Sequence, residues 1–396
     1  MSTLSVLSDD ARRRVRQRLV DAGGPVTATA VAAAVRAESG GVVADHELLG
    51  AIRELGDELG GTGPLQPLLT DPAVTDVLVN GPDDVWVDRG RGLQRVAVRF
   101  PDGDAVRRLA QRLAVAAGRR LDEAVPFVDA RLPDGTRLHA ALPPVAADGV
   151  YLSLRVHRPA AHGLAALRAL GTVSEEMEAV LRAIVAARLA FLVVGGTGSG
   201  KTTLLGALLG CVDPAERLVC VEDAGELHPA HPHLVRLVTR PPNIEGVGEV
   251  TLRDLVRQAL RMRPDRIVVG EVRGAEVCEL LTSLNTGHEG GAGTLHANSV
   301  HEVPARLEAL AALGGLGRLA LHSQLAAALH VIVEIARHPG GRREVTAIGV
   351  LDRSRELVRV TPAWRAAIGW TSGRDALAAL LRARGQELPA PAWASC

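Results

Sequence analysis

A glycine-rich segment at residues 195–202 constrains the fold of this chain more than any other feature. Its sequence, GGTGSGKT, fits the pattern G-x-x-x-x-G-K-[ST] at every fixed position. An apolar run of strand length, AFLVV, precedes it at 190–194, and a helical pattern follows it at 203–210. In that setting the backbone N–H groups of the loop wrap a phosphate, and the helix N-terminus stabilises its negative charge. The segment therefore predicts a nucleotide site at the end of a strand.

The side chains of this loop have distinct expected roles. Lys201 is expected to bridge the β- and γ-phosphates, and Thr202 to hold Mg²⁺. Lys201 is also the only lysine of the chain, which suggests that arginine cannot take its place. The expected cofactors are thus ATP and Mg²⁺, and the expected nucleotide ligands are Gly195, Gly196, Thr197, Gly198, Ser199, Gly200, Lys201, Thr202 and Thr203.

Composition narrows the class of protein. The 45 basic residues balance 45 acidic ones, and 47% of the chain is apolar, enough for a large core. Aromatic residues make up 2%, too few for base-stacking platforms, which argues against nucleic acid as a partner. Apolar runs stay well short of the ~18 residues that a membrane span needs, so the chain is expected in the cytoplasm. The four cysteines are too irregularly spaced for a disulfide framework or a metal site.

Pattern changes along the chain predict its domain organisation. Residues 1–45 are expected to form a peripheral helical segment, and 46–157 a smaller α+β domain of short strands and helices. A proline, a glycine and small residues mark 158–163 as a linker. Continuous apolar runs at 190–194, 218–221 and 266–269 alternate with helical patterns, which predicts a mainly parallel sheet covered on both faces over 164–361. Residues 362–396 are expected to form a helical tail.

Two carboxylates are candidates for catalysis. A P-loop protein that hydrolyses nucleotide needs an acidic residue at the end of a neighbouring strand, and Glu271 stands directly after the run at 266–269. A second acidic cluster, EDAGE at 222–226, follows the run at 218–221 and ends with Glu226. Both lie where parallel sheets place their ligands.

Four segments together resemble a known family. The loop GGTGSGKTT, the acidic box VEDAGELH, the strand RMRPDRIVVGEVRG and the histidine box TGHEGGAGTLHAN are similar to the signatures of secretion-superfamily ATPases, the hexameric motors of type II and type IV secretion and type IV pili. The closest resemblance is to the CpaF/TadA type of tight-adherence pilus ATPase, and it extends over about 61–348. It implies a RecA-like motor domain, a hexamer, and an inner-membrane secretion or pilus platform as the partner on the cytoplasmic face.

The resemblance also implies roles for further residues. Glu271 matches the Walker B glutamate that activates water, and Glu226 matches a second catalytic glutamate. His288 and His296 match the two histidine-box positions near the γ-phosphate. Arginines of the acidic-box region and of the N-terminal domain are implied to reach the nucleotide; they are Arg236, Arg240, Arg137 and Arg155.

These features favour an ATPase that drives assembly of a tight-adherence pilus or type II/IV secretion. A type IV secretion or conjugal DNA-transfer ATPase shares all four segments and remains an alternative. A P-loop phosphotransferase acting on a small molecule is an alternative of another class, and it predicts a complete site in one subunit. A nucleotide switch without catalysis is disfavoured because Lys201, Thr202, Glu226 and Glu271 are all present.

Overall fold

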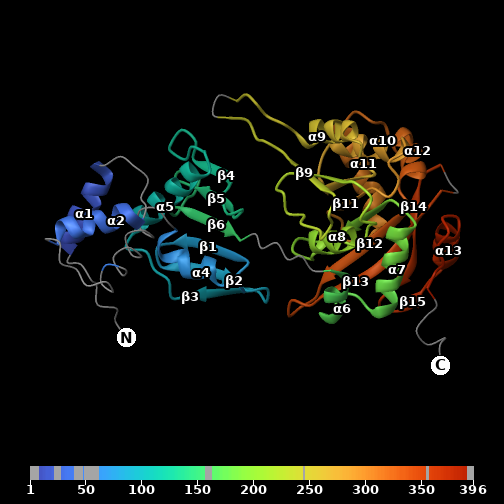
Figure 1. Cartoon of the computed structure of the whole chain (residues 1–396), viewed down its shortest axis with the longest axis horizontal. Helices are drawn as coiled ribbons and strands as arrows, with labels where there is room; N and C mark the ends of the chain where they lie inside the picture. The colour runs from blue at the N-terminus through green and yellow to red at the C-terminus, as the bar shows by residue number, and fades with distance from the viewer. Residues whose placement is uncertain are drawn as a thin grey trace. The chain divides into compact units, whose positions relative to one another are not determined.

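The computed structural model describes residues 9–21, 28–39, 48, 62–156, 163–243, 246–353 and 356–389. The chain divides into two compact units, Met1–Arg158 and Pro159–Cys396 (Figure 1). Most of the start of the expected α+β domain, most of the expected linker 158–163 and the last residues of the expected tail lie outside the described ranges. Within those ranges, no helix combines the length and apolarity needed to cross a membrane.

The first unit opens with a pair of helices. They are α1, Asp9–Asp21, and α2, Ala28–Glu38. Val15 of α1 and Val31 and Val35 of α2 are fully buried in a small cluster of their own. Both helices lie within residues 1–45, the range of the expected peripheral helical segment.

The rest of the first unit is one antiparallel sheet with helices on one face. Its strands run in the order β3-β2-β1-β6-β5-β4, with neighbours antiparallel. Valines and leucines at alternate strand positions, such as Val77 and Val79, bury one face against α5, whose N-cap Asp102 accepts a hydrogen bond from the backbone N–H of Ala105. The elements are η1 Gly63–Leu65, α4 Gln66–Thr70, β1 Asp76–Gly81, β2 Asp84–Asp88, β3 Leu93–Val96, α5 Gly103–Ala116, β4 Phe127–Arg131, β5 Arg137–Ala141 and β6 Tyr151–Arg155.

The second unit is built on a nine-stranded sheet in the order β15-β14-β13-β12-β7-β11-β10-β8-β9. The strands β12, β7, β11, β10, β8 and β9 are parallel to one another, and β13, β14 and β15 continue the sheet antiparallel. Its strands are β7 Phe191–Val194, β8 Leu218–Glu222, β9 Leu234–Val238, β10 Arg266–Val272, β11 Ala292–Leu295, β12 Val331–Arg337, β13 Arg343–Asp352, β14 Arg359–Arg365 and β15 Gly369–Trp370. Its helices are α6 Leu164–Ala169, α7 Glu175–Ala186, α8 Lys201–Leu209, α9 Leu252–Ala259, η2 Leu260–Met262, α10 Glu276–Asn285, η3 Val300–Glu302, α11 Val303–Leu313, α12 Arg318–Ala328 and α13 Arg374–Arg382.

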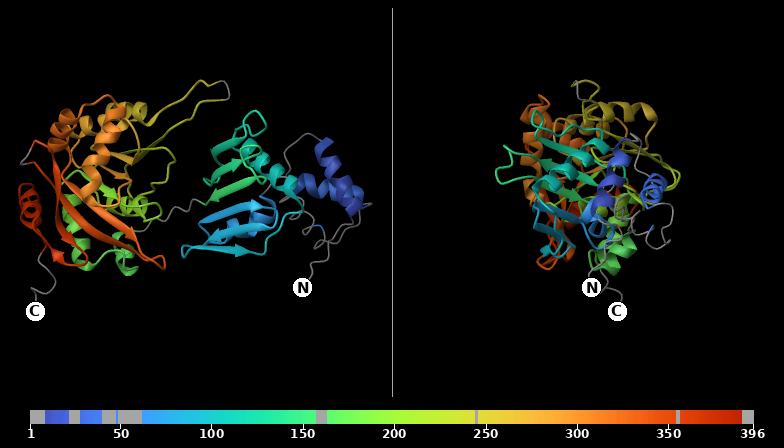
Figure 2. Two further views of the ribbon diagram at one scale, coloured as in Figure 1. Left: turned by 180° about the vertical axis from the view of Figure 1, so that it is seen from behind. Right: turned by 90° about the vertical axis from the view of Figure 1, so that its left-hand side faces the viewer.

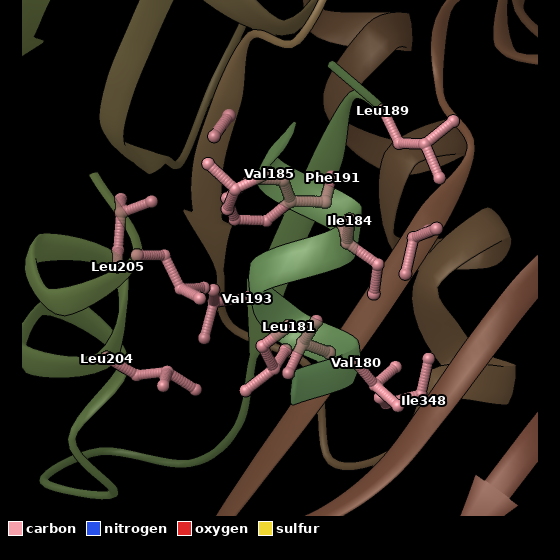
Figure 3. Close-up of a cluster of buried hydrophobic side chains, with 14 of the residues drawn as sticks. Val180, Leu181, Ile184, Val185, Leu189, Phe191, Val193, Leu204, Leu205 and Ile348 are labelled. Carbon is pink, nitrogen blue, oxygen red and sulfur yellow. The ribbon is translucent and has the colours of Figure 1, made fainter. Parts of the chain in front are cut away.

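The sheet of the second unit is buried on both faces. Phe191 and Val193 of β7 pack with α6, α7, α8 and α13, and Figure 3 shows this cluster around Leu181 and Ile184 of α7. Leu192 and Val194 point to the other face, where α9, α10, α11 and α12 cover the sheet. The continuous apolar sequence of β7 follows from this double burial.

The structure confirms the α/β class and extends the sheet beyond the expected motor region. The expected boundary at 361 falls inside β14, and the expected helical tail contains the strand β15 before its helix α13. Pairing of β14 with β13 keeps Ala363 and Trp364 in the same core as β7, so this segment belongs to the sheet.

A buried histidine links the amino end of β7 to that of β12. His330 Nδ1 accepts a hydrogen bond from the backbone N–H of Ala190 at 3.2 Å, and the backbone N–H of His330 donates back to Ala190 O at 3.0 Å. The guanidinium of Arg384 lies against the other ring nitrogen, and Arg353 is close. Burial, reinforced by these two cations, lowers the pKa of His330 to about 4.

We expect this histidine to make the stability of the second unit sensitive to acid. Its folded pKa lies below the ordinary value of 6.5, so the unfolded chain takes up the proton first. The contribution is fully present above pH 6.5 and is lost as the pH falls toward 4, by about 1.4 kcal/mol per pH unit. His330→Asn, whose Oδ1 can accept from Ala190, should remove that slope in denaturant titrations between pH 6.5 and 4. The exposed His301, changed to Asn, should leave it in place; equal slopes in all three proteins would contradict the assignment.

Candidate functional site

The carboxyl ends of the parallel strands bring the predicted groups to one edge of the nine-stranded sheet. The P-loop follows β7, Glu271 lies near the end of β10, and Glu222 ends β8. β11 lies between β7 and β10, and His296 follows it directly. Register pairing of Val268 with Ala292 and of Ala292 with Phe191 fixes these ends relative to one another.

The P-loop can form only because its first and sixth residues are glycines. Gly195 has φ +156°, and a methyl group there would lie 2.2 Å from Ile335 O of β12. Gly200 is the N-cap of α8 with φ +100°, a conformation that other residues rarely adopt. The loop therefore turns directly against the neighbouring strand, with the N-terminus of α8 at its end.

Lys201 folds back over the loop. Its Nζ donates to Gly195 O at 3.0 Å and to Gly196 O at 2.9 Å, and the residue is 9% exposed. Burial lowers the pKa of Lys201, and the nearby carboxylate of Glu271 opposes that effect. The ammonium group of Lys201 thus lies over the loop, and a bound anion there would take the place of its two carbonyl acceptors.

The loop suits a bound phosphate in other respects. The Oγ of Ser199 is buried and has no hydrogen-bond partner among the described residues, and Ser199 N–H makes only a long bond of 3.4 Å to Gly196 O. Thr202 and Thr203 are half-buried in the first turn of α8. Donors gathered around a glycine-lined turn fit a nucleotide phosphate, and the Thr202 hydroxyl suits Mg²⁺.

Glu271 is held beside the loop by its neighbours. Its carboxylate is half-buried and pairs with Arg273, whose Nε lies 2.7 Å from Oε2. Thr294 of β11 donates to Gly270 O at 2.7 Å, and Oε1 of the buried Glu276 accepts from the N–H groups of Arg273 and Gly274. These contacts fix the backbone on both sides of Glu271, whose carboxylate pairs with the exposed Arg273.

The acidic box depends on a buried carboxylate that the sequence did not single out. Glu222 Oε1 accepts from the backbone N–H of Glu226 at 2.8 Å and of Leu227 at 2.9 Å. Burial raises the pKa of Glu222, and its Oε2 has no partner within the described chain. A methyl group on Gly270 would lie 2.7 Å from Glu222 Cγ, so Glu222 crosses over the residue before Glu271. Glu222 thereby connects the loop of Glu226 to the end of β10.

The two histidines of the histidine box lie at opposite edges of the sheet. His296 is exposed and follows the carboxyl end of β11, beside the other groups of the site. His288 precedes β11, so the whole length of that strand separates the two, and its Nδ1 lies 3.3 Å from Ser283 O. Within the second unit the structure therefore does not place His288 with the P-loop, contrary to the expectation from the family resemblance.

The four candidate arginines fall into two groups. Arg236 of β9 is hydrogen-bonded to His228 beside the acidic box, whereas Arg240 Nε donates to Gly248 O at 2.7 Å across the base of the 239–251 loop. Arg137 and Arg155 belong to the first unit, where they face each other across β5 and β6. Arg155 Nε donates to Asp76 Oδ1 at 2.9 Å. Their role at the nucleotide remains a prediction.

Arg343 is a further cation at the P-loop that sequence reasoning missed. It lies on β13, and its Nε donates to Gly198 O at 3.1 Å. Nothing in the local sequence marks it, because the contact joins residues 145 positions apart.

Comparison with known proteins places this site in a family. A family model described as "Type II/IV secretion system protein" matches residues 58–382. A "Putative conjugal transfer protein" of Mycobacterium tuberculosis strain H37Rv is 60% identical over 349 residues, covering 87% of this chain and 99% of that protein. The chain belongs to the type II/IV secretion ATPases. It is accordingly an ATP hydrolase.

Other relatives of this secretion ATPase agree. The protein VirB11 of Agrobacterium fabrum is 32% identical over 311 residues, covering 69% of this chain and 88% of that protein. The crystal structure of the pilus retraction motor PilT with bound ADP has a TM-score of 0.50 at 18% identity, over 82% of this chain and 89% of that one, which supports the fold. The superfamily is therefore established, and the tight-adherence subtype remains a prediction.

We expect Glu222 to stabilise the loop of Glu226 in this secretion ATPase by accepting its backbone hydrogen bonds. Glu222→Ala leaves the N–H groups of Glu226 and Leu227 without an acceptor, which should lower the free energy of unfolding by about 2–4 kcal/mol and reduce kcat. Glu222→Gln keeps an acceptor at Oε1 and should stay within about 1 kcal/mol of the parent. Denaturant titration and phosphate release measure both effects, with the exposed Glu249→Ala as the control. An alanine variant as stable and active as that control would refute this role.

Proposed function

We propose that this secretion ATPase is the cytoplasmic motor of a type IV secretion or conjugal-transfer machine at the inner membrane. The observation that carries the proposal is the convergence of the P-loop, Glu271 and the acidic box at one sheet edge, in a chain 60% identical to a protein described as a conjugal transfer protein. The motor acts on its membrane partner, so the proposal needs no nucleic-acid groove in the chain itself, in keeping with the low aromatic content.

In the proposed reaction, ATP binds with its phosphates in the loop 195–202. Lys201 leaves the Gly195 and Gly196 carbonyls for the β- and γ-phosphates, and Thr202 holds Mg²⁺. The bound Mg²⁺ supplies charge neutralisation on the phosphate oxygens. Glu271 orients and activates the attacking water, with Glu226 as a second carboxylate and His296 on the γ-phosphate side.

Additional positive charge is proposed to come from the first unit. In its sheet, Arg131 of β4, Arg137 of β5 and Arg155 of β6 stand in register across three adjacent strands. Asp76 of β1 lies opposite Arg155 at the end of this row and accepts a hydrogen bond from its Nε at 2.9 Å. We propose that this row contributes guanidinium groups to the phosphates when subunits assemble into a ring, the hexamer implied by the family resemblance.

A second candidate is assembly of a tight-adherence pilus. The stretches RPPNIEG at 240–246 and RLPDG at 131–135 resemble that subfamily. Both candidates share the chemistry of the site and differ in the membrane partner.

The catalytic assignment is tested by two substitutions. Lys201→Ala should abolish nucleotide binding, because the loop loses the cation that meets the β- and γ-phosphates. Glu271→Gln should bind ATP with near-parental affinity and hydrolyse it at least about 100-fold more slowly, because water activation is lost. Filter binding of labelled ATP and phosphate release separate the two effects. Hydrolysis by Glu271→Gln at the parental rate would show that another group activates the water.

A genetic experiment in the cell distinguishes the two candidate machines. The gene is deleted, and the deletion strain receives either the parental chain or Glu271→Gln. We expect plasmid transfer only in the strain with the parental chain. Surface pili should be present in every strain. The two measurements are the frequency of plasmid transfer per donor cell and the number of surface pili seen by electron microscopy. Pili lost in step with ATPase activity, with transfer unaffected, would favour the tight-adherence motor instead.

A further inference from the structure

The hairpin of β12 and β13 carries two arginines toward the P-loop. The strands β12 and β13 are the long orange strands of the second unit in Figures 1 and 2. Arg337 ends β12, Arg343 begins β13, and the two stand directly opposite each other in the register of the hairpin. Arg342 and Glu344, which alternate with Arg343 along the chain, form an ion pair of 2.8 Å with each other. Glu344 Oε2 also lies 2.8 Å from His338 Nε2, so this carboxylate pairs with Arg342 and His338, on the strand face opposite Arg343.

Both arginines lie against the glycines of the loop. Arg343 Nε donates to Gly198 O at 3.1 Å, and a methyl group on Gly200 would lie 3.0 Å from Arg343 Cδ. A methyl group on Gly198 would lie 3.5 Å from Nη1 of Arg337. The hairpin thus touches the middle of the loop, on the side of β12.

The bond to Gly198 O has a consequence for the next N–H group. In a planar trans peptide the C=O and N–H point in opposite directions, so the orientation of Gly198 O fixes that of Ser199 N–H. With Gly198 O held by Arg343, Ser199 N–H points the other way, toward Gly196 O at 3.4 Å. Lys201 Nζ donates to that same Gly196 carbonyl at 2.9 Å. Two donors of the loop therefore share one acceptor, which a phosphate oxygen could replace.

The peptide between Gly198 and Ser199 needs such an anchor. Gly198 has φ +69°, and a glycine on one side lowers the cost of turning this peptide over. A turned peptide would direct Gly198 O at the phosphate and remove Ser199 N–H from it. Repulsion between the carbonyl and the phosphate oxygens would then weaken binding.

We propose that Arg343 is a positioning residue of the nucleotide site. Its Nε holds the Gly198–Ser199 peptide with the carbonyl outward and the N–H toward the phosphate. Arg343 acts on the loop and does not take part in the bond cleavage. The effect concerns binding of substrate and product phosphates alike, so it appears in KM and in the affinity for ADP and leaves kcat nearly unchanged.

The test uses two substitutions of Arg343 and one matched control. Glutamine carries an amide nitrogen at the chain position of arginine Nε, so Arg343→Gln keeps the donor and removes the charge. Arg343→Ala removes both. Arg342→Ala changes the adjacent arginine, which pairs with Glu344.

Titration calorimetry with ADP and steady-state phosphate release give the expected order. Arg343→Ala should weaken ADP binding and raise KM about tenfold, with kcat within about twofold, the pattern of lost uniform binding. For Arg343→Gln, the ADP affinity and KM should stay within about threefold of the parental values. For Arg342→Ala, both should equal the parental values. A glutamine variant as weak as the alanine variant would overturn the proposal, because charge alone would then explain the effect.

The stability of the unliganded proteins removes the remaining ambiguity. The melting temperatures of the three variants without nucleotide should lie within about 2 °C of the parent. Arg343→Ala with a lowered melting temperature and parental ADP affinity would mean that the arginine only joins β13 to the loop, and it would overturn the positioning role. Parental affinity together with parental stability would overturn it as well.

Discussion

The nucleotide site depends on how tightly β7 is enclosed by its parallel neighbours. β12 and β11 pair with β7 in register on either side, and each face of β7 lies in a separate apolar core. At its carboxyl end the chain must turn at once, because Ile335 O of β12 occupies the space where a Cβ of residue 195 would lie. Only glycine fits there, and from that point the loop, the N-terminus of α8 and Lys201 follow. The chemistry of the loop is thus a consequence of sheet packing.

Elements with local signals were predictable, and elements defined by distant pairing were not. The continuous apolar run at 190–194 indicated a strand buried on both faces, and the structure confirms this for β7. β11, four residues with a central glycine, has no strand signal of its own and exists because β10 and β7 pair with it. The expected helical tail began at residue 362, so the end of β14 and the whole of β15 were expected to be helical; pairing of β14 with β13 and of β15 with β14 overrides that expectation.

The same division holds for the site. Glycine spacing and Lys201 marked the P-loop, and the position of Glu271 after an apolar strand marked the second strand end. Glu222 and Arg343 act through backbone groups of other segments, a relation that no spacing reveals. For His288 the expectation placed two residues together that the structure separates. His288 is close to His296 in sequence, yet β11 lies between them, so the two are at opposite edges of the sheet. Proximity along a strand is a poor guide, since every two residues add about 6.6 Å.

The two edges of the nine-stranded sheet carry their polar groups in different ways. At the amino edge, Arg266 is 1% exposed and makes two bonds to Glu216, at 2.8 and 2.9 Å, and a third to Val185 O. Arg188 adds a second cation to Glu216, so the starts of β8 and β10 and the end of α7 are joined by one charge network. Such a buried network adds little net stability but specifies how its elements are oriented. At the carboxyl edge, the buried Ser199 Oγ and Glu222 Oε2 have no hydrogen-bond partner among the residues that the structure describes. That edge is where the phosphates, and the water that attacks them, would supply the missing bonds.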